Sequence, residues 1–196
     1  MSSEYRLSLP AQTVETAEPR ARTVLESAQA SLGFVPNMYA AMANSPGLLE
    51  SYQHGYALFR QESGFTPVEQ EVVFLSISRE NGCHYCMAAH SFVADHISKV
   101  PRPVTDAIRD RQPIPDARLA VLSVFTVAMV ITRGQPSRRD VESFLSAGYS
   151  ERHVLEIILA IAVKTLSNYA NHLFHTPVDE AVASRAWRPC ATATSG

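Results

Sequence analysis

Helix-start signals followed by helically spaced apolar residues are the feature that most constrains the fold of this chain. At 45–46, 66–67 and 176–177, a serine or threonine suited to the N-cap precedes a proline suited to the first helical position. Thr66 is also followed by Glu69, which completes a capping box. Apolar residues after these starts recur at intervals of three and four, and no stretch alternates with a period of two. The pattern predicts an all-α protein.

The connectors between the expected helices are short. The segments 33–36 and 134–136 break the helical pattern sharply, and 101–115 carries four prolines and several charges. We expect 101–115 to be an exposed crossing between two halves of the molecule. The expected helices cover residues 18–32, 36–43, 46–62, 67–80, 84–98, 103–110, 116–131, 138–147, 151–173 and 177–187.

Length and composition exclude several classes of protein. A chain of 196 residues is long enough for one domain, or two small halves packed as one. A net charge of −2 without a basic tract argues against nucleic acid as a partner. The N-terminal stretch lacks the apolar region of a secretory signal, and the longest apolar run, 119–131, is shorter than the roughly 20 residues that span a bilayer. We therefore expect a cytoplasmic protein with no membrane partner.

The three cysteines point to redox or metal chemistry, because an odd number does not suit a secreted disulfide framework. A turn signal at 81–82 precedes Cys83, so a helix should begin there with Cys86 in its first turn. His90 lies four residues after Cys86 and seven after Cys83, which places all three groups on one face. Cys190 lies in a polar tail and has no expected role.

This arrangement favours a reactive thiol pair. Unpaired N–H groups at a helix start stabilise a thiolate, and a neighbouring imidazole can accept the thiol proton. A second thiol within disulfide reach allows a two-electron redox cycle. Glu71 lies among apolar residues of the preceding expected helix, where a buried carboxylate needs a partner such as a histidine. The two interpretations of Glu71 are a proton relay and a surface glutamate on an amphipathic helix.

Three other interpretations of the thiol pair compete with redox chemistry. A closed zinc site needs a fourth ligand, drawn from His84, Asp95 or His96, but one helix cannot surround a metal by itself. We therefore expect no metal. The cysteines could instead be inert core residues. A thioredoxin-like fold would place the pair after a strand, and this stretch of the chain is helical.

A weak internal repeat accompanies the pair. From Glu71 the first cysteine lies 12 residues on, the second three further and the histidine four beyond. The same intervals lead from Glu156 to Asn168, Asn171 and His175. A duplicated helical unit with asparagine in place of cysteine fits this pattern. A polar helix face explains the second set equally well.

The segment TPVEQEVVFLSISRENGCHYCMAAH closely resembles the core motif of the AhpD-like alkylhydroperoxidases, within the carboxymuconolactone decarboxylase superfamily. That pattern is Glu, eleven residues, Cys-x-x-Cys, three residues and His, and Glu71, Cys83, Cys86 and His90 match it position by position. The flanks LGFVPNMYAAMANSPGLLESY and VKTLSNYANHLFHTPVD are similar to the peroxidase-related branch. The resemblance predicts an extension with the first helix over 1–29, an AhpD-like helical domain over 30–182 and a tail over 183–196.

The resemblance implies an all-α fold, homo-oligomers such as trimers or hexamers, and no bound cofactor. It implies that Cys86 attacks the peroxide O–O bond and that Cys83 resolves the sulfenic acid as a disulfide. It implies that His90 deprotonates Cys86 and that Glu71 completes the proton relay. An external dithiol such as a lipoyl-bearing protein would reduce the disulfide, and a peroxiredoxin could be a partner.

One departure concerns the residues between the cysteines. The founding alkylhydroperoxidases carry a histidine just before the second cysteine, whereas here that position is Tyr85 and the histidine is His84. Tyrosine donates a hydrogen bond but is a poor base near neutral pH. The relay would then run through His90 and Glu71 alone, with Tyr85 and His84 as neighbours. The decarboxylase branch lacks the cysteine pair, which disfavours lactone decarboxylation.

Three hypotheses follow for the function. The first is a cytoplasmic thiol peroxidase that reduces organic hydroperoxides or hydrogen peroxide. The second is a disulfide reductase or redox sensor, which would react slowly with peroxide but exchange fast with a dithiol. The third is a non-catalytic helical assembly module, suggested by the apolar segments 119–131 and 151–173.

Overall fold

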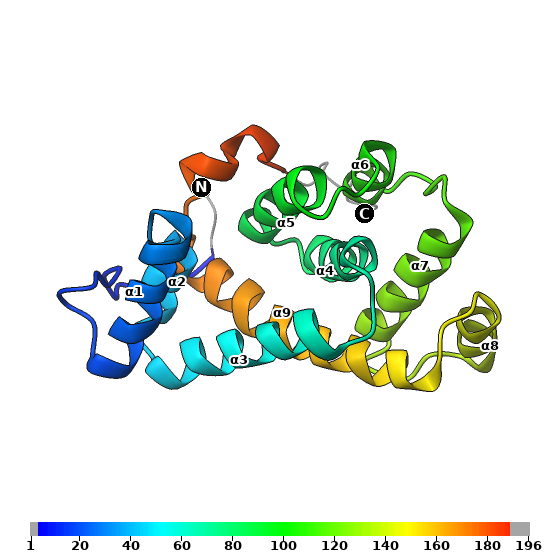
Figure 1. The fold of residues 1–196 in the computed structure, drawn as a ribbon, viewed down its shortest axis with the longest axis horizontal. Coiled ribbons are helices and arrows are strands. Elements are labelled where there is room, and N and C mark those ends of the chain that lie inside the picture. Colours follow the sequence, from blue (N-terminus) through cyan, green and yellow to red (C-terminus); the bar gives the residue numbers. More distant parts are fainter. Residues whose placement is uncertain (1–3, 189–196) are drawn as a thin grey trace.

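The computed structural model describes residues 4–188, and these residues form helices and connecting loops without a strand. The all-α prediction is confirmed (Figure 1). The helices are α1 (Pro19–Leu32), α2 (Asn37–Met42), α3 (Pro46–Glu62), α4 (Pro67–Glu80), α5 (His84–His96), α6 (Arg102–Asp110), α7 (Ala117–Ile131), α8 (Arg138–Ser146) and α9 (Glu151–Phe174), followed by the 3₁₀ helix η1 (Glu180–Arg185). Cys190 lies outside the described residues.

The helix α4 is the centre of the bundle. It begins at the capping box of Thr66 and Glu69, as the sequence predicts. Every residue from 69 to 78 is buried, because α5, α6, α7 and α9 all pack against this helix. A helix surrounded in this way needs an apolar surface on all sides, and the buried polar residues of α4 must each find a partner.

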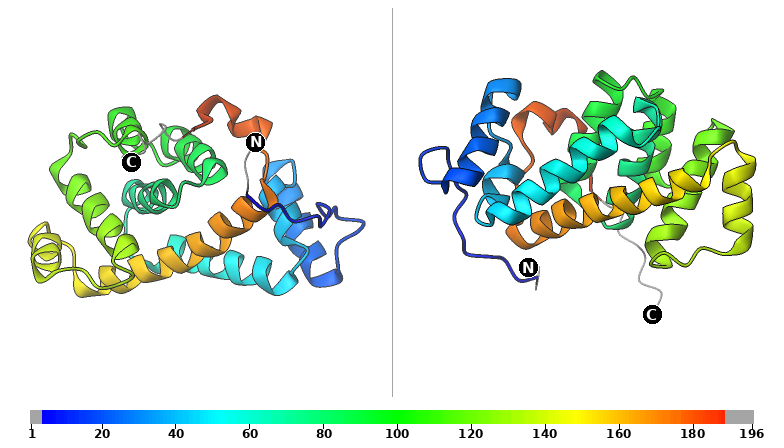
Figure 2. Two further views of the ribbon diagram at one scale, coloured as in Figure 1. Left: turned by 180° about the vertical axis from the view of Figure 1, so that it is seen from behind. Right: turned by 60° about the horizontal axis from the view of Figure 1, so that its bottom comes forward.

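The helices α3 and α9 lie side by side along one edge of the molecule (Figures 1 and 2). Gly55 allows this contact, because a Cβ atom there would lie 2.8 Å from a methyl group of Val163. By length and composition alone, α9 could also cross a membrane. The helix α9 packs against α2, α3, α4 and α7, and these core contacts explain its apolar composition equally well.

Two expected features differ in the structure. Thr176 does not start a helix, because residues 177–179 form a loop and only the short η1 follows. The Asp179 side chain fixes this loop by accepting hydrogen bonds from the backbone N–H of Asn37, at 2.9 Å, and from the Tyr85 hydroxyl. The segment 101–115 is also less exposed than predicted, because α6 buries Val104 and Ile108.

The predicted division at residues 29 and 182 stays a prediction. The first boundary falls inside α1, which packs against α3. The internal repeat is also untested as a duplication. The first copy spans α4 and α5 with a turn between them, whereas the second lies within the single helix α9 and its C-terminal cap, His175.

Candidate functional site

The cysteine pair lies at the start of α5, next to the end of α4. Gly82 adopts a left-handed conformation with φ of 68°, which a glycine tolerates at no steric cost, and this turn separates the two helices. Cys83 is the N-cap residue of α5 and Cys86 lies in the first turn, as the sequence predicts. Both thiols are free and buried.

The helix α9 supplies polar partners to both sulfur atoms. The Asn171 side-chain amide donates to the Cys86 Sγ at 3.3 Å and to the Cys83 Sγ at 3.9 Å. The Ser167 Oγ lies 3.9 Å from the Cys86 Sγ. Asn168 accepts a hydrogen bond from the Asn81 side chain at 2.9 Å. Asn168 and Asn171 are therefore buried against the cysteine pair and do not form an exposed polar face, whereas Glu156 is half-buried and His175 is exposed.

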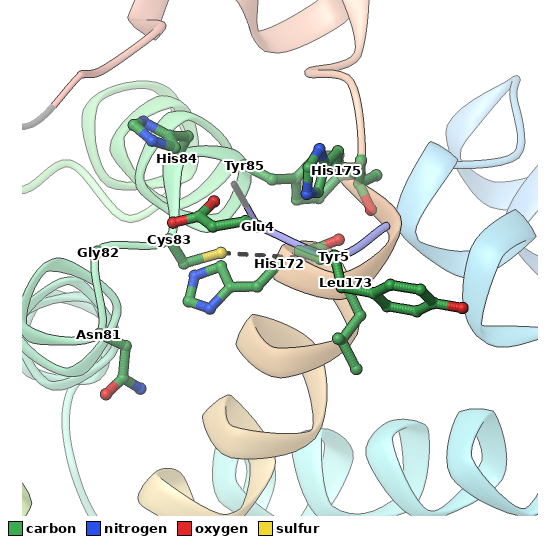
Figure 3. A pocket seen from close by; sticks show the side chains of 12 residues that line it. Glu4, Tyr5, Asn81, Gly82, Cys83, His84, Tyr85, His172, Leu173 and His175 are labelled. Carbon is green, nitrogen blue, oxygen red and sulfur yellow. Dashed lines mark hydrogen bonds between the residues drawn. The ribbon is translucent and has the colours of Figure 1, made fainter. Parts of the chain in front are cut away.

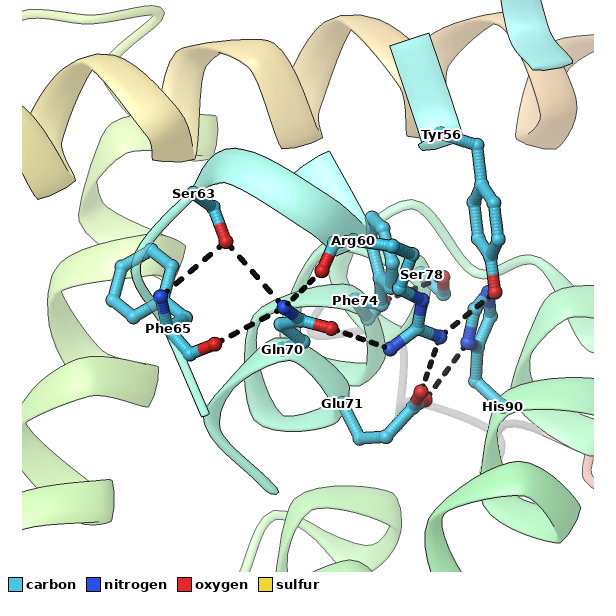
Figure 4. A network of polar contacts seen from close by, with 9 residues as sticks. All are labelled: Tyr56, Arg60, Ser63, Phe65, Gln70, Glu71, Phe74, Ser78 and His90. Atoms are coloured by element: carbon cyan, nitrogen blue, oxygen red, sulfur yellow. Dashed lines mark hydrogen bonds and ion pairs between the residues drawn. The ribbon is translucent and has the colours of Figure 1, made fainter. Parts of the chain in front are cut away.

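Glu71 is completely buried, so its interpretation as a surface glutamate is wrong. One carboxylate oxygen lies 2.9 Å from the Nδ1 of His90, and the other is paired with the guanidinium of Arg60 (Figure 4). Arg60 also donates to the Tyr56 hydroxyl at 2.8 Å and to the Gln70 side chain at 3.1 Å. The carboxylate predicted to act with a histidine therefore has that histidine and an arginine as its direct partners.

The pKa shifts set the charge of this group. Burial acts to raise the pKa of Glu71, but His90 and Arg60 outweigh it and hold the pKa below its usual value. Burial lowers the pKa of His90, and the positive charge of Lys164 lowers it further. Because an ionised carboxylate only accepts hydrogen bonds, the Nδ1 of a neutral His90 donates to Glu71. The Nε2 of the ring is then unprotonated and can act as a base.

The two thiols differ in acidity. The hydrogen bond that Cys83 donates to Cys86, together with burial, raises the pKa of Cys83. Burial also opposes ionisation of Cys86, but that hydrogen bond and the positive charge of Lys164 hold the pKa of Cys86 well below its usual value. The pair therefore keeps one proton on Cys83 and favours a thiolate at Cys86, the cysteine that the resemblance assigns to peroxide attack.

Two cationic residues of this site were missed by the sequence analysis. Arg60, on α3, carries no signal in its own segment and is found only through its contact with Glu71. Lys164, on α9, is 1% exposed, and its ammonium lies 5.5 Å from the ring centre of Phe74. Lys164 follows the apolar run ILAIAV, and a lysine at that place in a buried helix is a signal that could have found it.

Tyr85 and His84 lie beside the pair but direct their polar atoms elsewhere. The Tyr85 hydroxyl donates to the Asp179 carboxylate, and burial together with this carboxylate raises the pKa of Tyr85. The His84 Nδ1 lies 3.0 Å from the carbonyl oxygen of Trp187. In the described part of the chain, neither side chain forms a hydrogen bond to the sulfur atoms of Cys83 and Cys86. This is consistent with a proton relay that does not pass through residue 85.

A cavity of about 850 Å³ leads to the pair from the surface (Figure 3). Its lining includes Cys83, Asn171 and Tyr85 but not Cys86. The N-terminal segment runs along the rim, where Tyr5 lines the cavity and the backbone N–H of Leu7 donates to the carbonyl of Leu173 at 2.9 Å. Cys83 is therefore the sulfur that faces the cavity.

The described part of the chain holds no cluster of three or more histidine, cysteine, aspartate or glutamate side chains arranged for a metal ion. The fourth ligands considered for zinc are used elsewhere or lie apart. Asp95 is paired with Arg185 at 2.9 Å, and the ring of His96 packs on Phe92 at 4.5 Å between centres. His90 is bound to Glu71 instead of joining the two sulfur atoms.

No protein-family model matches this sequence, and no curated protein matches it at a significant level. Solved structures do match. A peroxidase-related protein from Ralstonia eutropha, described as an alkylhydroperoxidase AhpD core, superposes with a TM-score of 0.79 at 21% identity, covering 89% of this chain and 93% of that one. The fold is that of the AhpD core. The resemblance of residues 66–90 to AhpD-like proteins is thus confirmed for the fold.

Two further structures show how widely this AhpD-like fold is shared. A peroxidase-related protein from a Silicibacter species has a TM-score of 0.75 at 21% identity, covering 94% of this chain and 99% of that one. The debrominase Bmp8, as a cysteine-to-alanine variant in complex with 2,3,4-tribromopyrrole, has a TM-score of 0.73 at 18% identity, covering 94% and 97%. At these identities the likeness establishes the fold, and the reaction must be argued from the site.

Proposed function

We propose that this protein is a thiol peroxidase that reduces organic hydroperoxides or hydrogen peroxide through Cys86 and Cys83. The observation that carries the proposal is the geometry of the pair: both thiols are free at the start of α5, and the Asn171 amide donates to Cys86 at 3.3 Å and to Cys83 at 3.9 Å. The lowered pKa of Cys86 and the raised pKa of Cys83 agree with this arrangement. The buried His90 and Glu71 next to the pair provide a base and its partner. The peroxidase-related neighbours share the fold and are consistent with this chemistry.

The peroxide-dependent half of the reaction has two steps. The Cys86 thiolate attacks one peroxide oxygen, the O–O bond breaks, and Cys86 becomes a sulfenic acid while an alkoxide or hydroxide leaves. The leaving oxygen takes its proton from solvent, because the Nε2 of the neutral His90 carries none. The Cys83 thiol then attacks the sulfenic sulfur, which forms the disulfide and releases water. The peroxide has gained two electrons, and the pair has lost two.

We propose that an external dithiol resets the pair by attacking Cys83. Cys83 lines the cavity and Cys86 does not, so a thiol that enters the cavity meets the Cys83 sulfur first. Breaking the disulfide there releases Cys86, the more acidic thiol and the better leaving group. The dithiol becomes a disulfide and the protein regains both thiols. A lipoyl group fits this role because its two thiols are on one slender arm, and a peroxiredoxin partner would act through the same cavity.

A peptide mass map tests the proposal. The protein is fully reduced, exposed to one equivalent of an organic hydroperoxide for a few seconds, blocked with an alkylating agent and digested. We expect a Cys83–Cys86 disulfide while Cys190 remains alkylated. If Cys83 and Cys86 both stay alkylatable, the peroxidase proposal fails. Unreactive thiols in every condition would instead support a non-catalytic assembly module.

The disulfide reductase or redox sensor remains the second candidate, because Cys83 lines the cavity through which an exchanging thiol would enter, whereas Cys86 does not line it. It predicts slow oxidation by peroxide but fast reduction of the preformed disulfide by dihydrolipoamide. Stopped-flow rates of the two half-reactions separate the candidates. The same oxidation assay with a bromopyrrole in place of peroxide tests whether this site also removes bromine, since one neighbour is named a debrominase.

We also propose that a second copy of the chain covers the surface between α7 and α9. This surface exposes Val124 and Ile131 of α7 and Leu155, Ile158 and Tyr169 of α9, and Ile158 and Tyr169 line a groove between the helices. Such an apolar face suits a self-association site better than open solvent, and the resemblance implies homo-oligomers. A cytoplasmic location stays a prediction from the sequence.

The mass of the native particle checks this second proposal. We expect an oligomer by light scattering at micromolar concentration, and dissociation when Ile158 is replaced by aspartate, because a charge in an apolar interface is costly to desolvate. Leu32→Asp is the control, since Leu32 is also an exposed apolar residue but lies on α1. A wild-type monomer, or equal dissociation by both variants, would contradict the interface.

A further inference from the structure

Glu71 and Lys164 are buried beside the cysteine pair, and Arg60 is partly buried there. Arg60 and Glu71 form an ion pair, so their charges cancel. Lys164 remains, and its ammonium has no nitrogen or oxygen partner at hydrogen-bond distance among the residues that the structure describes. An isolated ammonium at 1% exposure is costly, so a protein that keeps one buried needs a negative charge close by.

The geometry of α9 points to the group that carries this negative charge. Lys164, Ser167 and Asn171 are spaced by three and four residues and share one face of the helix. The Asn171 amide contacts the Cys86 Sγ at 3.3 Å, and the Ser167 Oγ lies 3.9 Å from it, so this face covers the sulfur. Lys164 lies one turn before Ser167 on that face. We propose that the Lys164 ammonium is the counter-charge of a Cys86 thiolate in the reduced protein.

Other ionisable groups lie around this site on each of the packed elements, and none offers a second free cation within residues 4–188. These groups are Tyr52, Tyr56 and Arg60 of α3, Glu71 of α4, Cys83, Tyr85 and His90 of α5, His172 of α9, and Asp179 of the loop before η1. Burial raises the pKa of each of the three tyrosines and lowers that of both histidines, so these five are neutral near pH 7.

The remaining charges have partners of their own. The Arg60 guanidinium is bound to Glu71, and Asp179 accepts from Tyr85 and from the backbone of Asn37. The arginines that pack on α5 from α6 and η1 act further along the helix, where Arg109 donates to Ser91 at 2.7 Å and Arg185 pairs with Asp95. Lys164 is thus the one uncommitted cation near the pair in the described chain.

This pairing has a consequence for the redox balance. When the Cys86 thiolate and the Cys83 thiol form a disulfide, they lose two electrons and one proton, and the negative charge disappears. Lys164 is then buried without a counter-charge. It therefore stabilises the reduced pair more than the disulfide, which makes the disulfide a stronger oxidant and easier for a dithiol to reset. The inference rests on the proposed thiol chemistry and adds a residue that sets both acidity and potential.

The test compares Lys164→Met with Lys99→Met. These are the two lysines of the chain, and Lys99 is exposed, so the second variant controls for loss of a lysine. The rate of Cys86 alkylation by iodoacetamide is followed against pH by peptide mapping. We expect the pH at which the alkylation rate is half-maximal to rise by at least about one unit in Lys164→Met. Such a rise corresponds to a tenfold loss of thiolate below neutral pH. Lys164→Arg keeps a charge and should retain most of the wild-type profile.

The second readout is the equilibrium between the dithiol and disulfide forms in dithiothreitol buffers. We expect the disulfide of Lys164→Met to be at least tenfold more stable, which corresponds to a potential about 30 mV lower. Unchanged alkylation and redox equilibrium relative to Lys99→Met would overturn the proposal. If Lys164→Met does not fold, Lys164→Gln takes its place in both measurements, and the thiolate of the wild-type protein provides a further test. A wild-type protein with no more thiolate absorbance at 240 nm, pH 7, than Cys86→Ser also overturns it.

Peroxide turnover enters neither readout. A Lys164-dependent thiolate without peroxide reaction would keep this inference and end the peroxidase proposal. Rapid peroxide reduction by a thiolate whose pKa does not depend on Lys164 would support the peroxidase proposal and contradict this inference.

Discussion

Replacing Cys86 with serine is expected to lower peroxide turnover by about 10³-fold or more, as removal of a nucleophile does in other enzymes. The reason is that Cys86 is the sulfur whose pKa its surroundings lower, and a serine hydroxyl at the same place does not attack an O–O bond. Turnover is measured as consumption of cumene hydroperoxide coupled to oxidation of dihydrolipoamide.

Cys83→Ser is the matched variant, and it should behave differently. Without Cys83 no disulfide can form, so turnover stops, but Cys86 should still react once with peroxide and remain a sulfenic acid. Dimedone labelling followed by mass spectrometry detects that species. The pair of variants therefore assigns the two roles. Dimedone labelling of Cys83 in Cys86→Ser, with none in Cys83→Ser, would reverse them and make the sulfur that faces the cavity the attacking one.

The part of the site that lies close together in the chain could be predicted from the sequence. Cys83, Cys86 and His90 lie on one helix, α5 and its N-cap, so their spacing alone determines that they lie on a common face. The matched motif pairs Glu71 with His90, and the two side chains lie 2.9 Å apart in the structure. Local spacing carries such information because a helix has a fixed geometry.

The groups that set the electrostatics come from elsewhere in the chain, and spacing says nothing about them. Arg60 reaches Glu71 from α3, and Lys164 and Asn171 reach the pair from α9. Asp179 holds Tyr85 through a loop that the Thr-Pro signal wrongly assigned to a helix. Proline and an N-cap residue permit a helix start, but here the tertiary contacts of Asp179 determine the local conformation.

Replacing Glu71 with glutamine should have the largest effect on folding. Arg60 would lose its carboxylate while remaining largely buried, and removing one partner of a buried ion pair typically costs about 3–5 kcal/mol of unfolding free energy. Urea unfolding at pH 7 measures the loss. Glu50→Gln is the matched control, because Glu50 pairs with Arg20 at the surface, with side-chain exposures of 36% and 66%, and solvent screening leaves such an exposed pair with little effect on stability.

The pH dependence separates a charge effect from a packing effect. The folded-state pKa of Glu71 lies below its unfolded value, so its contribution to stability is complete above the unfolded pKa of about 4.3. That contribution is lost as the pH falls through the lower folded-state pKa. The difference in unfolding free energy between wild type and Glu71→Gln should therefore be constant above pH 5 and shrink in more acid solution. A difference that stays the same down to that folded-state pKa would mean that glutamine fails through its packing, and that the Glu71 charge does not stabilise Arg60 and His90.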